Sequence, residues 1–263
     1  MRRIAPRLAA AVALAMTSFG LLIAVADNAQ AGKAWNEIRS AAFAGRTIQP
    51  AGELVQLSAP FRPLDQRAVP IDVEVTFPDG RSVRGITLIV DENPSPVAAR
   101  FDFGGTRQHV HIATKLRLNA ATDVRAVIET SDGQLFMAER FVHFAGGQAA
   151  CSAPPSGSPE EIAATMGKMS LEPLARLRIM HPNHTGMVLD QLTLLYVPLR
   201  ILTDIEVRQG KERVFAMQGS ITMAQDPVIE FDYRTNGATT LHVEARDSDG
   251  VSWSRDFPLG EGS

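Results

Sequence analysis

The chain has 263 residues, of which 45% are hydrophobic and 21% charged, and its formal net charge is −3. This composition is typical of a globular protein that buries a core, and it excludes a fibrous or wholly disordered chain. The slightly acidic charge gives no electrostatic reason to expect nucleic acid or an anionic membrane surface as a partner.

The first 31 residues have the pattern of a secretory signal peptide. A positive start with three arginines is followed by an apolar run over residues 8–26, and Ala29-Gln30-Ala31 supplies a small-x-small cleavage site. An uncleaved membrane anchor is the alternative, but the cleavage pattern argues against it. We therefore expect an exported mature chain that begins near Gly32.

Cys151 is the only cysteine of the chain, and it lies in the segment Gly146–Pro155, which has almost no apolar bulk. Such a segment cannot bury a core, so the sequence predicts a solvated, mobile linker and an exposed thiol. In an oxidising compartment a lone thiol indicates an intermolecular bond or a reactive group. A chance cysteine in a tolerant linker is the alternative. The interpretation that we favour makes Cys151 a covalent attachment point.

The first half of the chain reads as a short helix followed by strands. Trp35, Ile38 and Ala42 recur at helical spacing, which predicts an amphipathic helix over Lys33–Ala44 that covers one sheet. From residue 53 the apolar period changes to two. The predicted strands are residues 69–75, 83–91, 98–103, 109–118, 123–130 and 135–144. Strands at this spacing, without intervening helices, indicate a β-sandwich.

The second half repeats this pattern. Ser158, Pro159 and Glu161 form a capping box, which predicts a helix running toward Leu171. The predicted strands that follow are residues 175–180, 187–196, 200–208, 213–218, 228–233, 239–245 and 251–257. The sequence therefore predicts an all-β protein with short peripheral helices. Its parts are a signal peptide (1–31), a first sandwich (32–145), a cysteine-bearing linker (146–158) and a second sandwich with its leading helix (159–263).

Several groups of residues suggest metal binding, and each has a simpler explanation. Two histidine pairs, 109 with 111 and 181 with 184, lack a fixed third ligand, so hydrogen bonding in strands or turns is the better account. The acidic run 247–250 lacks the remaining ligands of an EF-hand and reads as a hairpin turn. The methionines at 166, 169, 180 and 187 are typical of packing. We expect neither a metal nor a cofactor.

No hydrolase, phosphate-binding or dinucleotide-binding signature is present, so the sequence does not indicate an enzyme. What remains is a set of short motifs in a fixed order. In the first half these are Val69-Pro70-Ile71, Glu92-Asn93-Pro94-Ser95-Pro96, Val124-Arg125-Ala126-Val127 and Gly146-Gly147. In the second half they are His181-Pro182, Gly186, Asp190-Gln191, Pro198, Ser220-Ile221, Asp226-Pro227 and Asp247-Ser248-Asp249-Gly250. The first set resembles the SoxY subunit of the bacterial sulfur-oxidation carrier, and the second resembles its partner SoxZ. The order is most similar to fused SoxYZ-like carriers associated with quinoprotein dehydrogenases.

The resemblance implies a periplasmic carrier made of two immunoglobulin-like domains, which takes part in the oxidation of sulfur compounds such as thiosulfate. In that family a cysteine on a Gly-rich arm holds sulfur intermediates for partner enzymes, which here implies a reactive Cys151 on an arm that begins with Gly146 and Gly147. The family arm reads Gly-Gly-Cys-Gly-Gly at a free chain end, whereas Cys151 is tethered on both sides. The implied partners are Sox-type enzymes or a quinoprotein dehydrogenase with its cytochrome. One alternative is a periplasmic adaptor or chaperone for such a dehydrogenase, with an incidental thiol. Another is a redox relay through mixed disulfides.

Overall fold

The computed structural model describes residues 34–144 and 146–259. The predicted signal peptide lies outside the described residues. Residues 34–43 form a helix, in agreement with the helix expected over residues 33–44, and this helix belongs to a unit separate from the rest of the chain. That it covers a sheet stays a prediction.

Strands dominate the rest of the first half, because apolar residues alternate with polar ones and each strand can bury one face. In β3 (Val69–Thr76) this alternation gives a buried residue at every second position. The other elements of this half are β1 (Ile48–Pro50), the short 3-10 helix η1 (Gly52–Leu54), β2 (Val55–Ser58), β4 (Val83–Val90), β5 (Val97–Phe103), β6 (His109–Leu116), β7 (Thr122–Thr130) and β8 (Leu135–Val142).

The second half begins with the 3-10 helix η2 (Ala150–Ser152) and α2 (Pro159–Thr165). The predicted capping box of α2 is confirmed, because Glu161 N donates to Ser158 Oγ at 3.2 Å and Ser158 N donates to the Glu161 carboxylate at 2.9 Å. The strands that follow are β9 (Met169–Glu172), β10 (Arg176–Ile179), β11 (Leu202–Gln209), β12 (Glu212–Gly219), β13 (Val228–Phe231), β14 (Thr240–Asp247) and β15 (Ser252–Pro258).

Two details of the second half differ from the sequence-based expectation. The helix ends at Thr165 rather than near Leu171, because Gly167 takes a positive φ of 78° and the chain enters β9. The predicted strand over residues 187–196 is wrong. This stretch belongs to an irregular loop, in which an isolated bridge joins Leu189 to Tyr196 and the Asp190 carboxylate accepts two main-chain hydrogen bonds that close a turn. Its apolar side chains have no opposing sheet face on which to pack.

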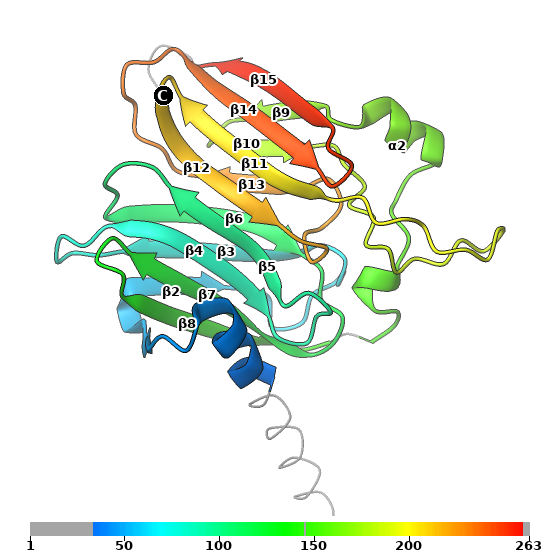
Figure 1. Cartoon of the computed structure of the whole chain (residues 1–263), viewed down its shortest axis with the longest axis horizontal. Coiled ribbons are helices and arrows are strands. Elements are labelled where there is room, and N and C mark those ends of the chain that lie inside the picture. Colours follow the sequence, from blue (N-terminus) through cyan, green and yellow to red (C-terminus); the bar gives the residue numbers. More distant parts are fainter. Residues whose placement is uncertain (1–33, 145, 260–263) are drawn as a thin grey trace, which may run out of the picture. The chain divides into compact units, whose positions relative to one another are not determined.

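The strands form two sheets, and both sheets run through the two halves of the chain (Figure 1). One has nine strands in the order β1-β8-β7-β4-β5-β12-β11-β14-β15, and the other has six in the order β2-β3-β6-β13-β10-β9. The halves join through two antiparallel edge pairs, β5 with β12 and β6 with β13. Sheet edges that would otherwise be open are therefore paired within one chain.

The core is also shared by the two halves. One continuous cluster of buried side chains contains Phe101 from the first half and Phe215 from the second, and their ring centroids lie 5.8 Å apart. The predicted class is confirmed, since the chain is mostly β and consistent with two immunoglobulin-like sandwiches. The proposed residue limits of the domains stay a prediction. Among the described residues, no helix is both long and apolar enough to cross a membrane.

Candidate functional site

Cys151 lies in the middle of η2, and its side chain is fully buried, with 0% of its surface exposed. The prediction of an exposed thiol is therefore wrong. The residues around it form a compact turn, because Ser152 N and Ser152 Oγ both donate to the main-chain oxygen of Ala149, at 3.1 and 3.0 Å. Gly146, Gly147 and Gln148 before the turn are exposed, whereas the small side chains of Ala150 and Cys151 are buried against the surrounding residues.

The turn is held by one hydrogen bond to each half of the chain. Cys151 N donates to Asn119 Oδ1 at 2.8 Å, and Asn119 follows β6 in the first half. Thr185 Oγ1, in the second half, donates to the main-chain oxygen of Cys151. Because both bonds involve the backbone, they fix the position of the turn without using the sulfur atom.

Asn93 supports Asn119 from the loop between β4 and β5. Its Oδ1 accepts a hydrogen bond from Asn119 N at 3.0 Å, and its Nδ2 donates to the main-chain oxygen of Arg117 at 2.7 Å. A buried ion pair between Asp91 and Arg125 fixes the start of the same loop, with 2.9 Å between nitrogen and oxygen. Three separate segments of the first half, which contain Asn93, Asn119 and Arg125, therefore support the cysteine turn.

Arg117 is a buried cation that interacts electrostatically with Cys151. Only 5% of its surface is exposed, and its guanidinium donates to the main-chain oxygens of Ile221, Met223 and Pro182. Among the described residues no carboxylate forms an ion pair with it. Burial lowers the pKa of Arg117 to about 10, and interaction with the Cys151 thiolate opposes this shift.

The thiol of Cys151 is held in its protonated form while the turn is in place. Burial raises the pKa of Cys151 above its ordinary value, although the positive charge of Arg117 and a hydrogen bond from Asn119 act in the opposite direction. A protonated, buried thiol is a poor nucleophile. Reaction at this sulfur therefore requires the turn to open.

His109, His111 and His181 make the side-chain hydrogen bonds that the favoured interpretation expected, whereas His184 Nδ1 is buried without a hydrogen-bond partner among the described residues. His109 pairs with Thr76 Oγ1 at 3.1 Å, and His111 pairs with the Asp72 carboxylate at 2.9 Å. The described residues hold no group of three or more histidine, cysteine or acidic residues placed to bind a metal ion.

The acidic run 247–250 forms the expected hairpin turn. Val251 N and Asp249 N donate to the buried Asp247 carboxylate, at 2.8 and 3.0 Å. Arg200 Nε donates to the same carboxylate at 2.8 Å, and His181 Nε2 lies 3.7 Å from it. The Asp247 carboxylate therefore stabilises the turn between β14 and β15.

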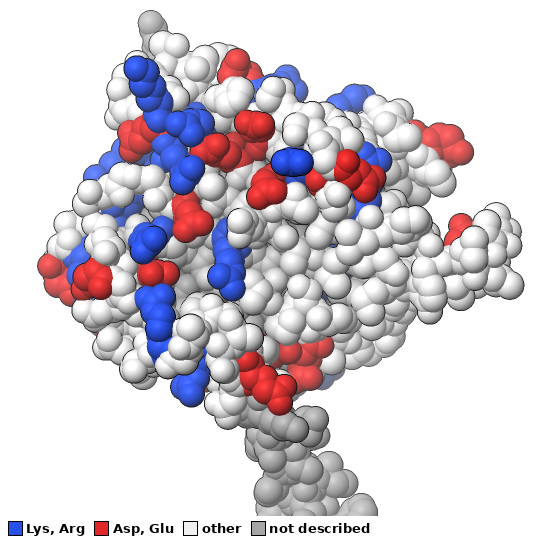
Figure 2. All heavy atoms as spheres, in the orientation of Figure 1, with Lys and Arg blue, Asp and Glu red and all other residues white. Residues whose placement is uncertain are grey.

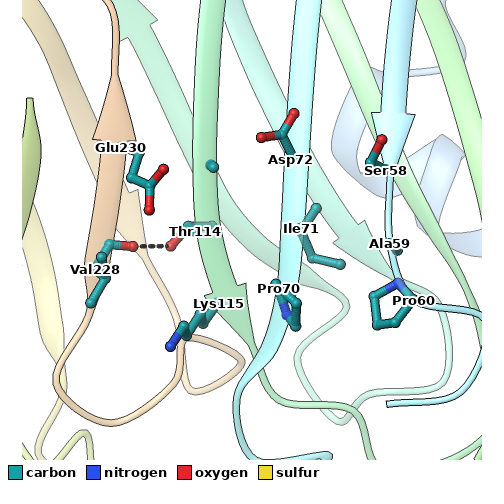
Figure 3. Close-up of a pocket in the computed structure, with 11 residues that line it drawn as sticks. Ser58, Ala59, Pro60, Pro70, Ile71, Asp72, Thr114, Lys115, Val228 and Glu230 are labelled. Carbon is teal, nitrogen blue, oxygen red and sulfur yellow. Dashed lines mark hydrogen bonds between the residues drawn. The ribbon is translucent and has the colours of Figure 1, made fainter. Parts of the chain in front are cut away.

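Three hollows lie in or near this region. A groove of about 390 Å³ crosses β3, β6 and β13, and it is lined mainly by apolar atoms (Figure 3). A pocket of about 210 Å³ has Ala150, Ala153 and Arg117 in its wall. A larger cleft of about 980 Å³ is bordered by Ser152, by α2 and by the loop over residues 187–199. The turn that carries Cys151 thus forms a wall shared by the second and third of these hollows.

The loop over residues 187–199, here called the apolar loop, exposes large hydrophobic side chains. Leu192 is 95% exposed, and Leu194, Leu195 and Tyr196 are each exposed by 66% or more. Figure 1 shows the loop projecting at the right, and Figure 2 shows almost no charge on that projection. Asp190 is its one charged residue. Such a surface is typical of a site for interaction with another protein.

Sequence reasoning identified Cys151 and its glycines but missed Arg117, Asn119 and Thr185. Gly146 and Gly147 both take positive φ angles near 95°, and Gln66 Nε2 donates to the Gly146 oxygen at 3.1 Å. Arg117 alternates with Leu116 and Leu118, a pattern that predicts a solvent-facing side chain. The one usable signal was the motif that contains Asn93, since this residue supports Asn119.

Comparison with known proteins gives two family matches and several distant structural neighbours. Residues 39–149 match the model of the sulfur oxidation protein SoxY, and residues 170–258 match that of the sulfur oxidation protein SoxZ. Cys151 lies between the two matched segments. No curated protein matches the chain.

Among solved structures, the chain is similar to the sulfur carrier protein SoxY from Chlorobium limicola f thiosulfatophilum. The identity is 23% and the TM-score 0.38, over 44% of this chain and 99% of that one. A superoxide reductase (neelaredoxin) from Ignicoccus hospitalis has 17% identity and a TM-score of 0.28, over 41% and 90% of the two chains. The YadV chaperone has 14% identity and a TM-score of 0.20, over 78% and 100%.

Proposed function

The chain belongs to the SoxY and SoxZ families, as a fusion of the two in one polypeptide, and on this premise we propose that it carries sulfur cargo covalently on Cys151. Members of these families are carrier and adaptor proteins rather than enzymes. One observation carries the proposal. The only cysteine of the chain follows the SoxY-like segment by two residues, in a turn that is hydrogen-bonded to both halves.

Cargo exchange on Cys151 needs a thiolate. The thiolate attacks a sulfur atom that bears a leaving group, so that one S–S bond forms while the bond to the leaving group breaks, as in thiol–disulfide exchange. Because the thiol is buried, the turn opens for loading and closes afterwards. Local openings of this kind require less free energy than global unfolding. The closed form then shields the bound sulfur from solvent and from other thiols.

The opening of the turn is limited by anchors on both sides. Gln66 holds Gly146, and Gln225 makes two hydrogen bonds to the main chain of Ser156, at 2.7 and 2.9 Å. With both ends fixed, about five residues on either side of Cys151 can extend, so the thiol travels at most about 18 Å. A partner enzyme must therefore approach the carrier closely, rather than receive a long arm into a deep channel.

The compartment and the partners are part of the same proposal. The signal-peptide pattern of residues 1–31 supports export to the periplasm, where a single thiol has no partner in its own chain. Sox-type enzymes are the partners that the two family matches support. A quinoprotein dehydrogenase stays a prediction.

Intact-mass measurement of protein isolated from its native compartment tests the carrier role. We expect additions in steps of one sulfur, or of a thiosulfonate, that reductant removes and that are absent from Cys151→Ala. An unmodified thiol, together with full activity of the pathway supported by Cys151→Ala, would exclude the carrier role. A glutathione- or protein-sized adduct would instead indicate a redox relay.

A second function, that of an adaptor with an incidental thiol, is supported by the exposed apolar loop. The expected partner is a periplasmic redox enzyme, such as a quinoprotein dehydrogenase or its cytochrome. Replacement of Leu192 and Leu195 by Ser removes exposed apolar surface without touching the core. If the adaptor function holds, this variant loses partner binding while Cys151→Ala retains it, in pull-downs against the purified dehydrogenase. Equal binding by all three proteins would argue against it.

A further inference from the structure

The packing around Cys151 determines where a cargo group can go. The thiol is completely buried, so atoms added to its sulfur cannot remain in the space that the thiol occupies. The two hollows beside the turn are the pocket of about 210 Å³ and the apolar cleft of about 980 Å³. The pocket has room for several water molecules, each of which takes about 30 Å³ in the liquid. It can therefore hold a small polyatomic ion.

The pocket is lined by four cationic side chains and two carboxylates. Arg67 is neutralised by Asp65, to which it donates two hydrogen bonds of 3.0 Å. Asp226 accepts a hydrogen bond from His181 N at 2.9 Å and interacts electrostatically with Arg178, so the two carboxylates offset only part of the charge of the four cations. The electrostatic balance of the pocket is positive.

Three further cations line the pocket, namely Lys115, Arg117 and Arg178, of which Arg178 interacts electrostatically with Asp226. Among the described residues, none of them forms an ion pair within 4 Å. Lys115 extends from the end of β6 in Figure 3, and both Lys115 and Val228 line the pocket as well as the groove shown there. Arg178 comes from β10, so both halves of the chain contribute charge to the pocket.

Arg117 connects this pocket to the cysteine. It lines the pocket and also interacts electrostatically with Cys151, while its own hydrogen bonds go only to main-chain oxygens. A buried guanidinium without a counter-ion is costly, and an anion that it contacts recovers part of that cost. Planar guanidinium groups also match oxyanions well through paired hydrogen bonds.

We propose that this pocket binds a small oxyanion of the sulfate or sulfonate class, and that this oxyanion is the end group of the cargo on Cys151. The second part rests on the proposed carrier function. Lys115, Arg117 and Arg178 contact the oxyanion from three sides, and the turn that carries Cys151 forms the remaining wall. The pocket therefore selects oxidised, charged cargo over a neutral sulfur chain, which fits the apolar cleft better.

Titration of the full chain with sodium sulfate at constant ionic strength, followed by calorimetry, tests the first part. We expect saturable binding of one sulfate, and the same affinity in Cys151→Ala, because the site does not need the thiol. Lys115→Gln and Arg178→Gln should each weaken binding about tenfold, or about 1.4 kcal/mol, because each removes a charge-assisted hydrogen bond to the anion. The matched control is Lys211→Gln, an exposed lysine in the turn between β11 and β12, which should bind like the parent. Equal affinity in all variants, or no saturable binding, would overturn the proposal.

Protein in which Cys151 has been converted to S-sulfocysteine tests the second part. If the tethered sulfonate occupies the pocket, free sulfate binds to the modified protein at least tenfold more weakly than to the unmodified protein. Lys115→Gln in the modified protein does not restore the binding of free sulfate. Undiminished sulfate binding would assign the pocket to a free oxyanion and overturn the link to cargo. The sulfate site and the proposed carrier function can fail separately. Sulfate binding by Cys151→Ala does not depend on whether the cysteine carries cargo in the cell, and cargo detected by mass does not depend on sulfate binding.

Discussion

The main-chain N–H of Cys151 donates to Asn119 Oδ1 at 2.8 Å, and this bond ties the cysteine turn to the end of β6 in the first half of the chain. The matching bond on the other side comes from Thr185 in the second half. Two side chains thus hold a buried thiol that lies between the SoxY-like and SoxZ-like segments. Breaking either bond should release the turn while the sheets stay intact.

Thr185→Val should expose the thiol of Cys151. Valine keeps the shape of threonine but removes the hydroxyl that donates to the Cys151 oxygen and accepts from Met187 N at 3.2 Å, and a net hydrogen bond contributes about 1 kcal/mol. We therefore expect the open form to be about five- to tenfold more populated. The rate of modification by a thiol reagent in native buffer measures this directly.

Thr203→Val provides the matched control for that variant. Thr203 Oγ1 donates to the main-chain oxygen of Arg246 at 3.2 Å, so the substitution removes a threonine hydrogen bond that does not involve the cysteine turn. Its thiol should react at the parental rate. If both variants react equally fast, the effect of Thr185 on the turn is not specific, and opening follows global stability instead.

The stability of the protein should fall at alkaline pH because of Cys151. Burial raises the pKa of this thiol above its ordinary value in the folded state. A group with a raised pKa stabilises the fold fully below its unfolded pKa, and this contribution is lost as the pH rises through the folded pKa. Urea denaturation from pH 7 to 10.5 should therefore show a steeper loss above pH 9 in the parent than in Cys151→Ser. Parallel curves for the two proteins would contradict the shift.

The shared core predicts that both halves unfold together. Phe215 is fully buried and lies 5.8 Å from Phe101 and 5.1 Å from Phe231, measured between ring centroids. Phe215→Ala should cost about 3–5 kcal/mol and lower a single calorimetric transition by roughly 10 °C. Phe61→Ala, at a ring that is 70% exposed, should leave the transition nearly unchanged. Two separate transitions, of which only one shifts, would mean that the halves are independent bodies.

The sequence predicted strands such as β3, β6 and β14 well because each alternates with a period of two. Which side chains of β3 and β6 are buried follows from this alternation alone. The union of the halves could not be read in this way, because the pairing of β5 with β12 joins Asp102 to Ala216, far apart in the chain. The same alternation misled at residues 187–196, where apolar residues are exposed in a loop.

The candidate site was predicted only in part. The position of Cys151 followed from its being the single cysteine, but its burial did not, since small residues fit a loop in solvent and a tightly packed turn equally well. Asn119 and Thr185, which are hydrogen-bonded to the backbone of Cys151, lie 32 and 34 residues from it in the chain. Contacts of that range depend on the tertiary fold, which no local pattern specifies.

Gly167, between α2 and β9, should not tolerate a side chain. It has a φ of 78°, and a Cβ atom added there would lie 2.0 Å from Trp253 Nε1, which real Cβ atoms do not approach. Gly167→Ala therefore combines backbone strain with displacement of an indole ring, and we expect a loss of about 3 kcal/mol or more in the free energy of unfolding. Urea denaturation followed by tryptophan fluorescence measures the loss and reports on Trp253 at the same time.

Gly237→Ala separates the two causes of that loss. Gly237 has a similar φ of 83°, but no atom lies within 4 Å of the position that its Cβ would take. This variant should lose only the cost of a left-handed backbone, about 1 kcal/mol. If Gly167→Ala is no more destabilising than Gly237→Ala, the indole ring moves aside freely, and Trp253 adds nothing to the cost of a side chain at position 167.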